Sequence, residues 1–219
     1  MLEQVCNMLD KNRANVGSIR ETLRGKFGEH KVYPDSINYL DGSFFFMALI
    51  RHSKKLVIYH EGKVYDKFTG EEKKYGDEKI KICDLSNENS VALREAFTFT
   101  APSPHKGIKI TMGLGDRLGL ASSGHIRTIK GKNVFPVLAQ QSIRELNLTE
   151  RTFKDVLSAA SWAVFQEGYT SGFGADGDHL KTADEVKTAI DCGYTMITLD
   201  CSEHINNTIP SLREGEIDS

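Results

Sequence analysis

Apolar residues in the first hundred positions recur with two different periods. Segments 2–10 and 16–27 carry an apolar side chain every three or four positions, which predicts two amphipathic helices. Three strands and a short helix are expected after them, at 44–50 (a continuous apolar run), 56–59, 79–85 (alternating apolar and polar) and 89–97. This pattern predicts a small α+β region.

Residues 100–106 (T-A-P-S-P-H-K) interrupt this pattern. They contain two prolines and no apolar period, so they can continue neither a helix nor a strand. We therefore expect a domain boundary here. It divides the chain into an α+β N-terminal region over 1–106, a second region over 107–205 and a polar tail over 206–219.

In the second region, predicted strands and helices alternate. The expected strands are 108–112, 135–139, 173–178 and 194–199. The expected helices are 123–130, a long one that Thr149-x-x-Thr152 and Asp155 introduce and that runs to about 169, and 184–192, which Gly193 can close. Alternation at this spacing predicts parallel strands joined by crossover helices, which is an α/β architecture.

Composition narrows the class of protein. The chain has 219 residues, of which 39% are hydrophobic and 26% charged, with a net charge of −2. This is an ordinary globular profile, and it indicates no nucleic-acid or membrane partner. The start lacks a signal-peptide pattern, and no apolar run reaches the ~20 residues that span a bilayer. Four scattered cysteines without a C-x-x-C pair indicate reduced thiols, so we expect a cytoplasmic protein.

Polar residues cluster after each predicted strand of the second region. The clusters are Asp116 and Arg117 after the first strand, Gln140, Gln141 and Arg144 after the second, Asp176, Asp178 and His179 at the third, and Asp200, Glu203 and His204 after the fourth. Single clusters of this kind also serve as turns and helix caps. Because the carboxyl ends of parallel strands meet at one edge of a sheet, four clusters in succession predict a shared active site.

Asp178-His179 is the sharpest of these signals. A carboxylate beside an imidazole can supply a base and a metal ligand to the same space, whereas a helix-capping aspartate next to a surface histidine is the alternative. Adjacent strand residues point to opposite faces, so both reach one site only if the strand ends or bulges there. Asp200 with His204 is a weaker pair that a turn would also explain.

Two other features admit more than one interpretation. The stretch 113–119 (G-L-G-D-R-L-G) follows a strand, but its spacing is one residue longer than the dinucleotide-binding fingerprint, and no acidic residue ends the next strand. Tight-turn glycines around a site aspartate, Asp116, are the alternative. Glu167, near the end of the long helix, can reach the site or be a solvated helix terminus.

Four stretches of the second region resemble the tagaturonate epimerase family. They are G-D-R-L-G-L-A-S-S-G-H-I-R at 115–127, P-V-L-A-Q-Q-S-I-R-E at 136–145, W-A-V-F-Q-E-G-Y at 162–169 and G-F-G-A-D-G-D-H-L-K-T at 172–182. The resemblance covers roughly residues 108–205. It implies a divalent-metal isomerase that interconverts tagaturonate and fructuronate, with a barrel-like catalytic domain. The second region is therefore expected to be the first half of a TIM-like (β/α) barrel.

The resemblance also implies roles for individual residues. The family's acidic proton acceptor followed by a histidine metal ligand matches Asp178 and His179, with Mn, Ni, Zn or Co as the expected cation. The family's proton donor and remaining ligands lie beyond this sequence. Near residue 200 the family pattern D-P-x-D-H reads Asp200-Cys201-Ser202-Glu203-His204 here. The candidate substrate-binding residues are Asp116, Arg117, Gln140, Gln141, Arg144, Glu167, Asp176, Lys181, Asp200 and His204.

The chemistry of this conversion suggests a mechanism. The two sugar acids differ at a carbon β to the ketone, whose C–H bond the carbonyl does not acidify. Our hypothesis is retro-aldol cleavage and re-addition, in which Asp178 takes the proton of the hydroxyl on that carbon and the metal stabilises the enediolate. Arg117, Arg144 or Lys181 would bind the substrate carboxylate, with arginine offering the better bidentate geometry.

The length of the chain leaves alternatives open. A complete (β/α)₈ barrel takes ~250 residues, and only four strands are predicted after residue 107. We therefore expect a truncated piece, a chain that needs a partner half, or a self-associating one. A non-catalytic fragment, or a related metal-dependent ketose isomerase or aldolase, stays open beside the epimerase.

Overall fold

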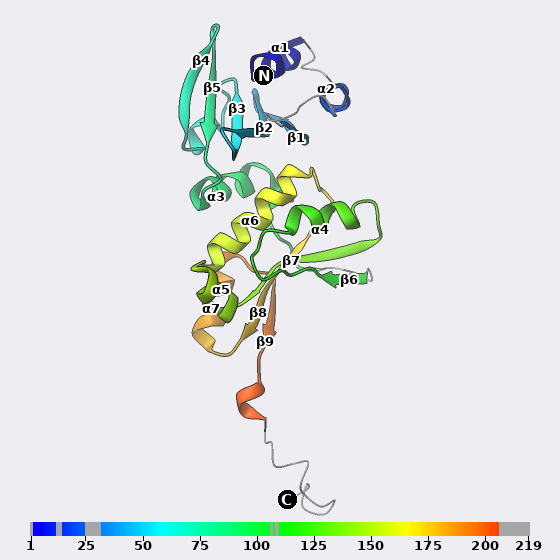
Figure 1. The fold of residues 1–219 in the computed structure, drawn as a ribbon, viewed down its shortest axis with the longest axis vertical. Helices are drawn as coiled ribbons and strands as arrows, with labels where there is room; N and C mark the ends of the chain where they lie inside the picture. The colour runs from blue at the N-terminus through cyan, green and yellow to red at the C-terminus, as the bar shows by residue number, and fades with distance from the viewer. Residues whose placement is uncertain (1, 12–14, 25–31, 106, 108–109, 206–219) are drawn as a thin grey trace, which may run out of the picture.

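The computed structural model describes residues 2–11, 15–24, 32–105, 107 and 110–205. It is an elongated molecule with an antiparallel sheet near one end and a parallel sheet toward the other (Figure 1). Helices α3 (Asn87–Ala96) and α6 (Phe153–Gln166) lie between the two sheets. No helix in the described ranges is long and apolar enough to cross a membrane.

The antiparallel sheet has five strands in the order β1-β2-β3-β5-β4. Their bounds are β1 Val32–Leu40, β2 Ser43–Ile50, β3 Ser53–Tyr59, β4 Glu71–Tyr75 and β5 Glu78–Cys83. A 3-10 turn, η1 (Tyr65–Lys67), connects β3 to β4. The continuous apolar run of β2 has a simple cause, because successive side chains enter two different cores, one on each face of the sheet.

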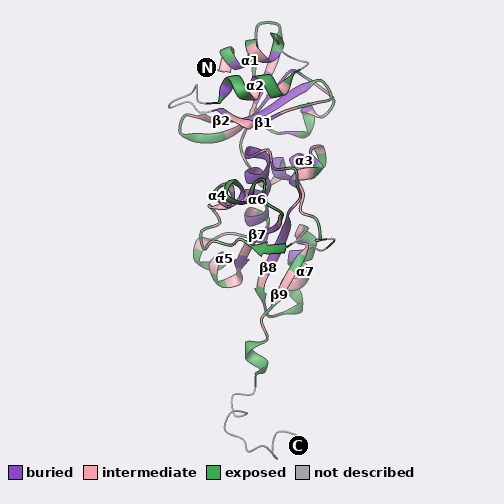
Figure 2. Cartoon of the chain, turned by 90° about the vertical axis from the view of Figure 1, so that its right-hand side faces the viewer, coloured by how far each residue is buried: buried purple, intermediate pink, exposed green. Residues whose placement is uncertain are grey.

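Helices α1 (Leu2–Lys11) and α2 (Val16–Leu23) cover the first face. Val5, Leu9 and Ile19 pack there with Phe44 and Phe46 of β2. On the second face, Phe45 packs with α3 and with two side chains of α6, Trp162 and Phe165. The central strand β2 is therefore buried on both faces, and buried residues, purple in Figure 2, gather in this sheet and around α3 and α6.

The parallel sheet has four strands in chain order, β6-β7-β8-β9. Their bounds are β6 Ile110–Gly113, β7 Val134–Ser142, β8 Gly174–Leu180 and β9 Met196–Leu199. The connecting helices are α4 (Ser122–Ile129), α5 (Ile143–Thr149), α6 and α7 (Ala183–Cys192). Residues of α4, α6, α7, β7 and β8 form one apolar core, so crossover helices cover the sheet as the α/β pattern requires.

The expected order of strands and helices in the second region is confirmed. The strand expected at 108–112 is described from Ile110 onward, and residues 108–109 lie outside the described part, as does the tail 206–219. The helix expected at 16–27 ends at Leu23, beyond which 25–31 are not described. Two strands, β1 and β4, and one α-helix, α5, were not predicted, nor were the short 3-10 turns. The domain boundary at 100–106 stays a prediction, because α6 packs into the cores of both sheets.

Candidate active site

A pocket of about 830 Å³ lies at the carboxyl ends of the parallel strands, within the size range of small-molecule sites. Polar residues from the ends of four different strands line it. They are Arg117 after β6, Ser142 at the end of β7 with Arg144 and Glu145 after it, Asp178, His179 and Lys181 at β8, and Asp200 after β9. Six predicted site residues therefore share one space, as expected for the edge where parallel strands end.

The end of β8 is bulged where Asp178 and His179 lie. The pairing of β8 with β9 shifts register between Gly177 and Leu180, and His179 adopts a φ of 54°. A non-glycine residue in this left-handed region breaks the alternation of a regular strand. The bulge meets the condition under which two adjacent side chains reach one pocket.

The environment of Asp178 suits a general base. Burial raises the pKa of its carboxyl, the charges of Asp176 and Glu145 raise it further, and His179 opposes them. A base with a raised pKa holds an abstracted proton more readily near neutral pH. His179 lies between two carboxylates, with Nε2 3.8 Å from Asp178 Oδ1 and Nδ1 3.9 Å from Asp200 Oδ2. Bonds from Ser202 hold the pKa of Asp200 below its usual range.

A divalent cation fits this corner only in part. His179 has a 60% exposed side chain and offers an imidazole nitrogen near two carboxylates, a donor set that transition metals accept. Yet the described residues contain no group of three or more His, Cys, Asp or Glu side chains arranged to hold a metal ion. The described residues thus offer one imidazole beside two carboxylates, which is less than a complete ligand set.

Asp176 is buried and Gln140 half-buried, and neither lines the pocket. Asp176 is fully buried, and its Oδ2 accepts hydrogen bonds from Gln140 Nε2 at 3.0 Å and Thr198 Oγ1 at 2.8 Å. Its Oδ1 is buried without a hydrogen-bond partner among the described atoms. Gln140, Asp176 and Thr198 lie on β7, β8 and β9, so their hydrogen bonds link these three neighbouring strands.

Asp116 and Gln141 build the loop that carries Arg117. The Asp116 carboxylate accepts backbone N–H bonds from Leu118, Leu120 and Ala121 at 3.0–3.1 Å. Burial would raise its pKa, but these donors hold it below the usual range. Gln141 Nε2 donates to the carbonyl oxygens of Asp116 and Arg117. The stretch 113–119 is therefore a tight turn organised by an aspartate that does not line the pocket.

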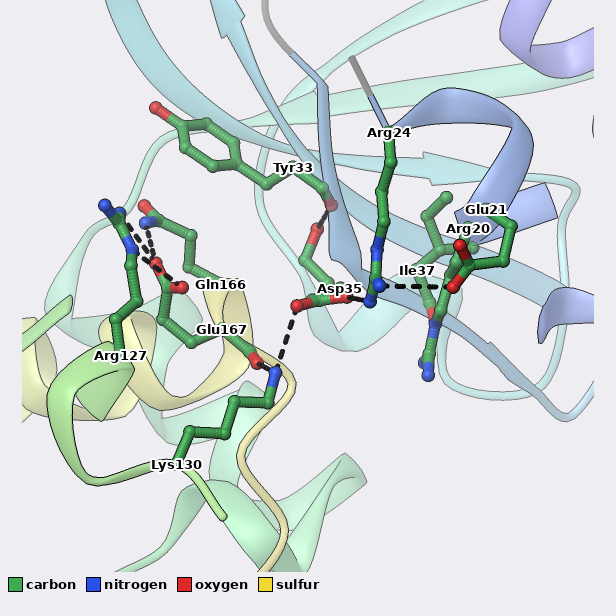
Figure 3. Close-up of polar contacts among 11 residues, drawn as sticks. Arg20, Glu21, Arg24, Tyr33, Asp35, Ile37, Arg127, Lys130, Gln166 and Glu167 are labelled. Carbon is green, nitrogen blue, oxygen red and sulfur yellow. Dashed lines mark hydrogen bonds and ion pairs between the residues drawn. The ribbon is translucent and has the colours of Figure 1, made fainter. Parts of the chain in front are cut away.

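Glu167 lies at the junction between the two sheets (Figure 3). Its carboxylate receives two hydrogen bonds from Arg127 of α4, at 2.9 and 3.0 Å. Lys130 donates to the backbone oxygen of Glu167 at 2.6 Å and to Asp35 of β1 at 3.0 Å. The structure thus places Glu167 in an ion-pair cluster that joins α4 and α6 to β1, and not among the residues that line the pocket. His204 is also outside that lining, exposed in the turn η3 (Ser202–His204).

Sequence reasoning missed two acidic residues that line the pocket, Glu185 in the first turn of α7 and Glu145. Glu145 is the third residue of α5, where its carboxylate accepts hydrogen bonds from the backbone and side chain of Ser142. Its other oxygen pairs with Arg117 and Arg144. The spacing Ser142-x-x-Glu145 is a capping-box pattern, which would have revealed both the short helix and this residue.

The fold and this pocket define an α/β protein with an aspartate–histidine pair, Asp178 and His179, in a pocket at the carboxyl ends of its parallel strands. A family model described as tagaturonate epimerase matches residues 33–219, and the chain belongs to this family. It is 36% identical to the tagaturonate/fructuronate epimerase of Thermotoga maritima over 199 residues, which make up 90% of this chain and 41% of that protein.

Solved structures of another epimerase are also similar to this chain. A native crystal structure of the fructuronate-tagaturonate epimerase UxaE from Cohnella laeviribosi is 46% identical with a TM-score of 0.81, covering 93% of this chain and 40% of that one. A structure of the same enzyme with one glycerol is 47% identical, also with a TM-score of 0.81, over 92% and 40%. The chain therefore spans about two-fifths of the length of these relatives.

Proposed function

We propose that this chain carries the proton acceptor and one metal ligand of an isomerase that interconverts tagaturonate and fructuronate. The observation that carries the proposal is the bulged end of β8, where Asp178 and His179 turn into one pocket with Asp200. The relatives bear this activity in their names, and the motif that contains both residues lies inside the matched family region.

The proposed reaction inverts the carbon β to the ketone without breaking its C–H bond. Asp178 takes the hydroxyl proton on that carbon, the adjacent C–C bond breaks, and the carbon becomes an aldehyde while the other fragment keeps the electron pair as an enediolate. The aldehyde group rotates, so that the enediolate attacks the opposite face of the aldehyde and the C–C bond forms again. Asp178 then returns the proton to the alkoxide on the inverted carbon. A bound divalent cation would supply positive charge that stabilises the enediolate, with His179 as one of its ligands.

The fold proposal follows from the strand order. Four parallel strands in chain order, with helices between them, are what the first half of a (β/α)₈ barrel would contain. Both edge strands expose apolar side chains, with Ile110 of β6 and Leu199 of β9 more than 60% exposed. This observation favours a second candidate function, a half-barrel that is active only when a partner segment or chain pairs with its edges.

The test is conversion of tagaturonate into fructuronate by the purified chain with Mn²⁺, Ni²⁺, Zn²⁺ or Co²⁺ added. We expect conversion that a chelator stops, and product formed in heavy water without deuterium on the inverted carbon. Deuterium on that carbon would contradict the retro-aldol route. If conversion requires adding the part of the Cohnella relative that this chain does not cover, the half-barrel function holds. Absence of conversion in both preparations would contradict the proposed function.

A further inference from the structure

The pocket has three cationic side chains, and their partners differ. Lys181 Nζ is 2.7 Å from Glu203 Oε1 and 3.9 Å from Asp200 Oδ2, so two carboxylates already neutralise it. Arg117 and Arg144 share one carboxylate, that of Glu145, at 2.9 and 3.2 Å. One negative charge against two guanidinium groups leaves an excess positive charge at the arginine pair.

Glu145 fixes where these two guanidinium groups meet. Its side chain is only 12% exposed, and one oxygen is held by the capping box with Ser142 at the start of α5. The other oxygen, Oε1, accepts from Arg117 Nη1 and Arg144 Nη2. Arg117 comes from the loop after β6 and Arg144 from the first turn of α5, with side chains that are 77% and 70% exposed. The shared, nearly buried oxygen of Glu145 therefore brings them together.

Most of the donors of this pair remain for a ligand. A guanidinium has five N–H donors, and each arginine gives one nitrogen to Glu145. Planar donor pairs of this kind bind carboxylates with two parallel hydrogen bonds. The arginines line the same pocket as Asp178 and His179, so an anionic group bound to them extends toward the proposed proton acceptor.

We infer that Arg117 and Arg144, joined by Glu145, form the subsite that binds the carboxylate of a sugar acid, and that Lys181 does not. This inference rests on the proposed function and selects one arrangement from the three cations that the sequence left open. Glu145 acts as a positioning residue, because it contacts the two arginines and leaves the ligand to them.

The test compares two ligands that differ in charge, tagaturonate and the neutral ketose tagatose, which has a hydroxymethyl group in place of the carboxylate. Dissociation constants are measured by NMR titration of the full chain and of Arg117→Gln, Arg144→Gln and Lys181→Gln variants. We expect the chain to prefer tagaturonate, and each arginine variant to lower that preference at least about tenfold while tagatose affinity stays within about twofold. Glu145→Gln, which removes the charge that joins the two arginines, should also lower the preference. Asp155→Asn changes the same capping-box position in α6 without contacting either arginine, so it is the matched control for Glu145→Gln and should keep the preference.

Binding and turnover are measured separately, so failure of the arginine subsite can be distinguished from failure of the proposed function. Loss of the preference in Lys181→Gln but not in the arginine variants would overturn it, as would a chain with equal affinity for the two ligands. Turnover is measured on the same samples. A carboxylate preference without conversion, both by the chain alone and after the uncovered part of the Cohnella relative is added, would leave the subsite standing and contradict the epimerase. Conversion without that preference would do the reverse.

Discussion

The two sheets of this protein differ in how completely their apolar side chains are buried. The antiparallel sheet is packed on both faces, and its central strand β2 is apolar on each of them. The parallel sheet shares a single apolar core with its helices, and its edge strands β6 and β9 expose Ile110, Met112, Met196 and Leu199. The candidate site lies on the less completely buried sheet. The first region is thus packed on both sides of its sheet, whereas the second exposes apolar side chains on its edge strands and carries the pocket at its strand ends.

The largest effect is expected where the two regions share a core. Phe165 of α6 is fully buried, and its ring centroid lies 5.3 Å from that of Phe97, beside the antiparallel sheet. Phe165→Ala removes this contact and leaves a cavity, so we expect the free energy of unfolding to fall by about 3–5 kcal/mol. Urea denaturation measures it. Leu120→Ala, at a side chain that is 78% exposed, is the control and should stay within about 0.5 kcal/mol. Equal effects of the two variants would contradict a shared core.

The junction cluster of Figure 3 should contribute less than this core. Glu167 is nearly buried and receives two hydrogen bonds from Arg127. Glu167→Gln should lower the free energy of unfolding by about 1–3 kcal/mol, because a charged acceptor is lost from a partly desolvated pair. The exposed pair Lys67–Glu95 gives the control, since Lys67→Gln should cost at most about 1 kcal/mol. A Glu167 variant that lost turnover with no loss of stability would instead assign this residue to the active site.

The loop of Asp116 should show a smaller effect that depends on pH. Its pKa is lowered in the folded state, so its contribution is complete above the unfolded value of about 3.9 and is lost as the pH falls through the lower folded value. Asp116→Asn should therefore cost about 1 kcal/mol at pH 7 and progressively less as the pH falls below about 3.9. Chemical denaturation across this range measures the difference. A difference that grew toward acid would contradict the hydrogen bonds assigned to this carboxylate.

The smallest change is expected at Lys130. Its ammonium group bridges Asp35 and the backbone of Glu167, but its side chain is 41% exposed. Solvent screening limits such a pair, so Lys130→Met should change the free energy of unfolding by about 0.5 kcal/mol. The same denaturation assay applies. A loss as large as that of Glu167→Gln would show that the exposed bridge, and not the nearly buried pair, holds the two regions together.

Sequence pattern predicted the inner strands and missed both edges of the antiparallel sheet, for physical reasons. β4 (E-E-K-K-Y) has charged residues at most positions and therefore carries no apolar signal, which is how edge strands avoid pairing. β1, the other edge strand, contains Pro34, a residue that argues against a central strand. α5 has only seven residues, too few for a helical period to be recognised.

The candidate site, like the fold, was predicted only in part. Strand ends are visible in the sequence, so Arg117, Arg144, Asp178, His179 and Asp200 were expected together and do share a pocket. Side chains that bind the backbone or a buried neighbour look the same in sequence as those that face a ligand. Asp116 and Asp176 were therefore assigned to the substrate, although both are occupied by contacts within the protein. Only the three-dimensional arrangement separates these roles.

The most direct measurement is the rate of tagaturonate epimerisation by Asp178→Asn, in the preparation that converts this sugar acid when Asp178 is present. Asparagine keeps the shape of the side chain and removes the proton acceptor. We expect the rate to fall about 10²- to 10⁴-fold with an unchanged free energy of unfolding. A variant that keeps the full rate would contradict the placement of the proton acceptor at the bulged end of β8.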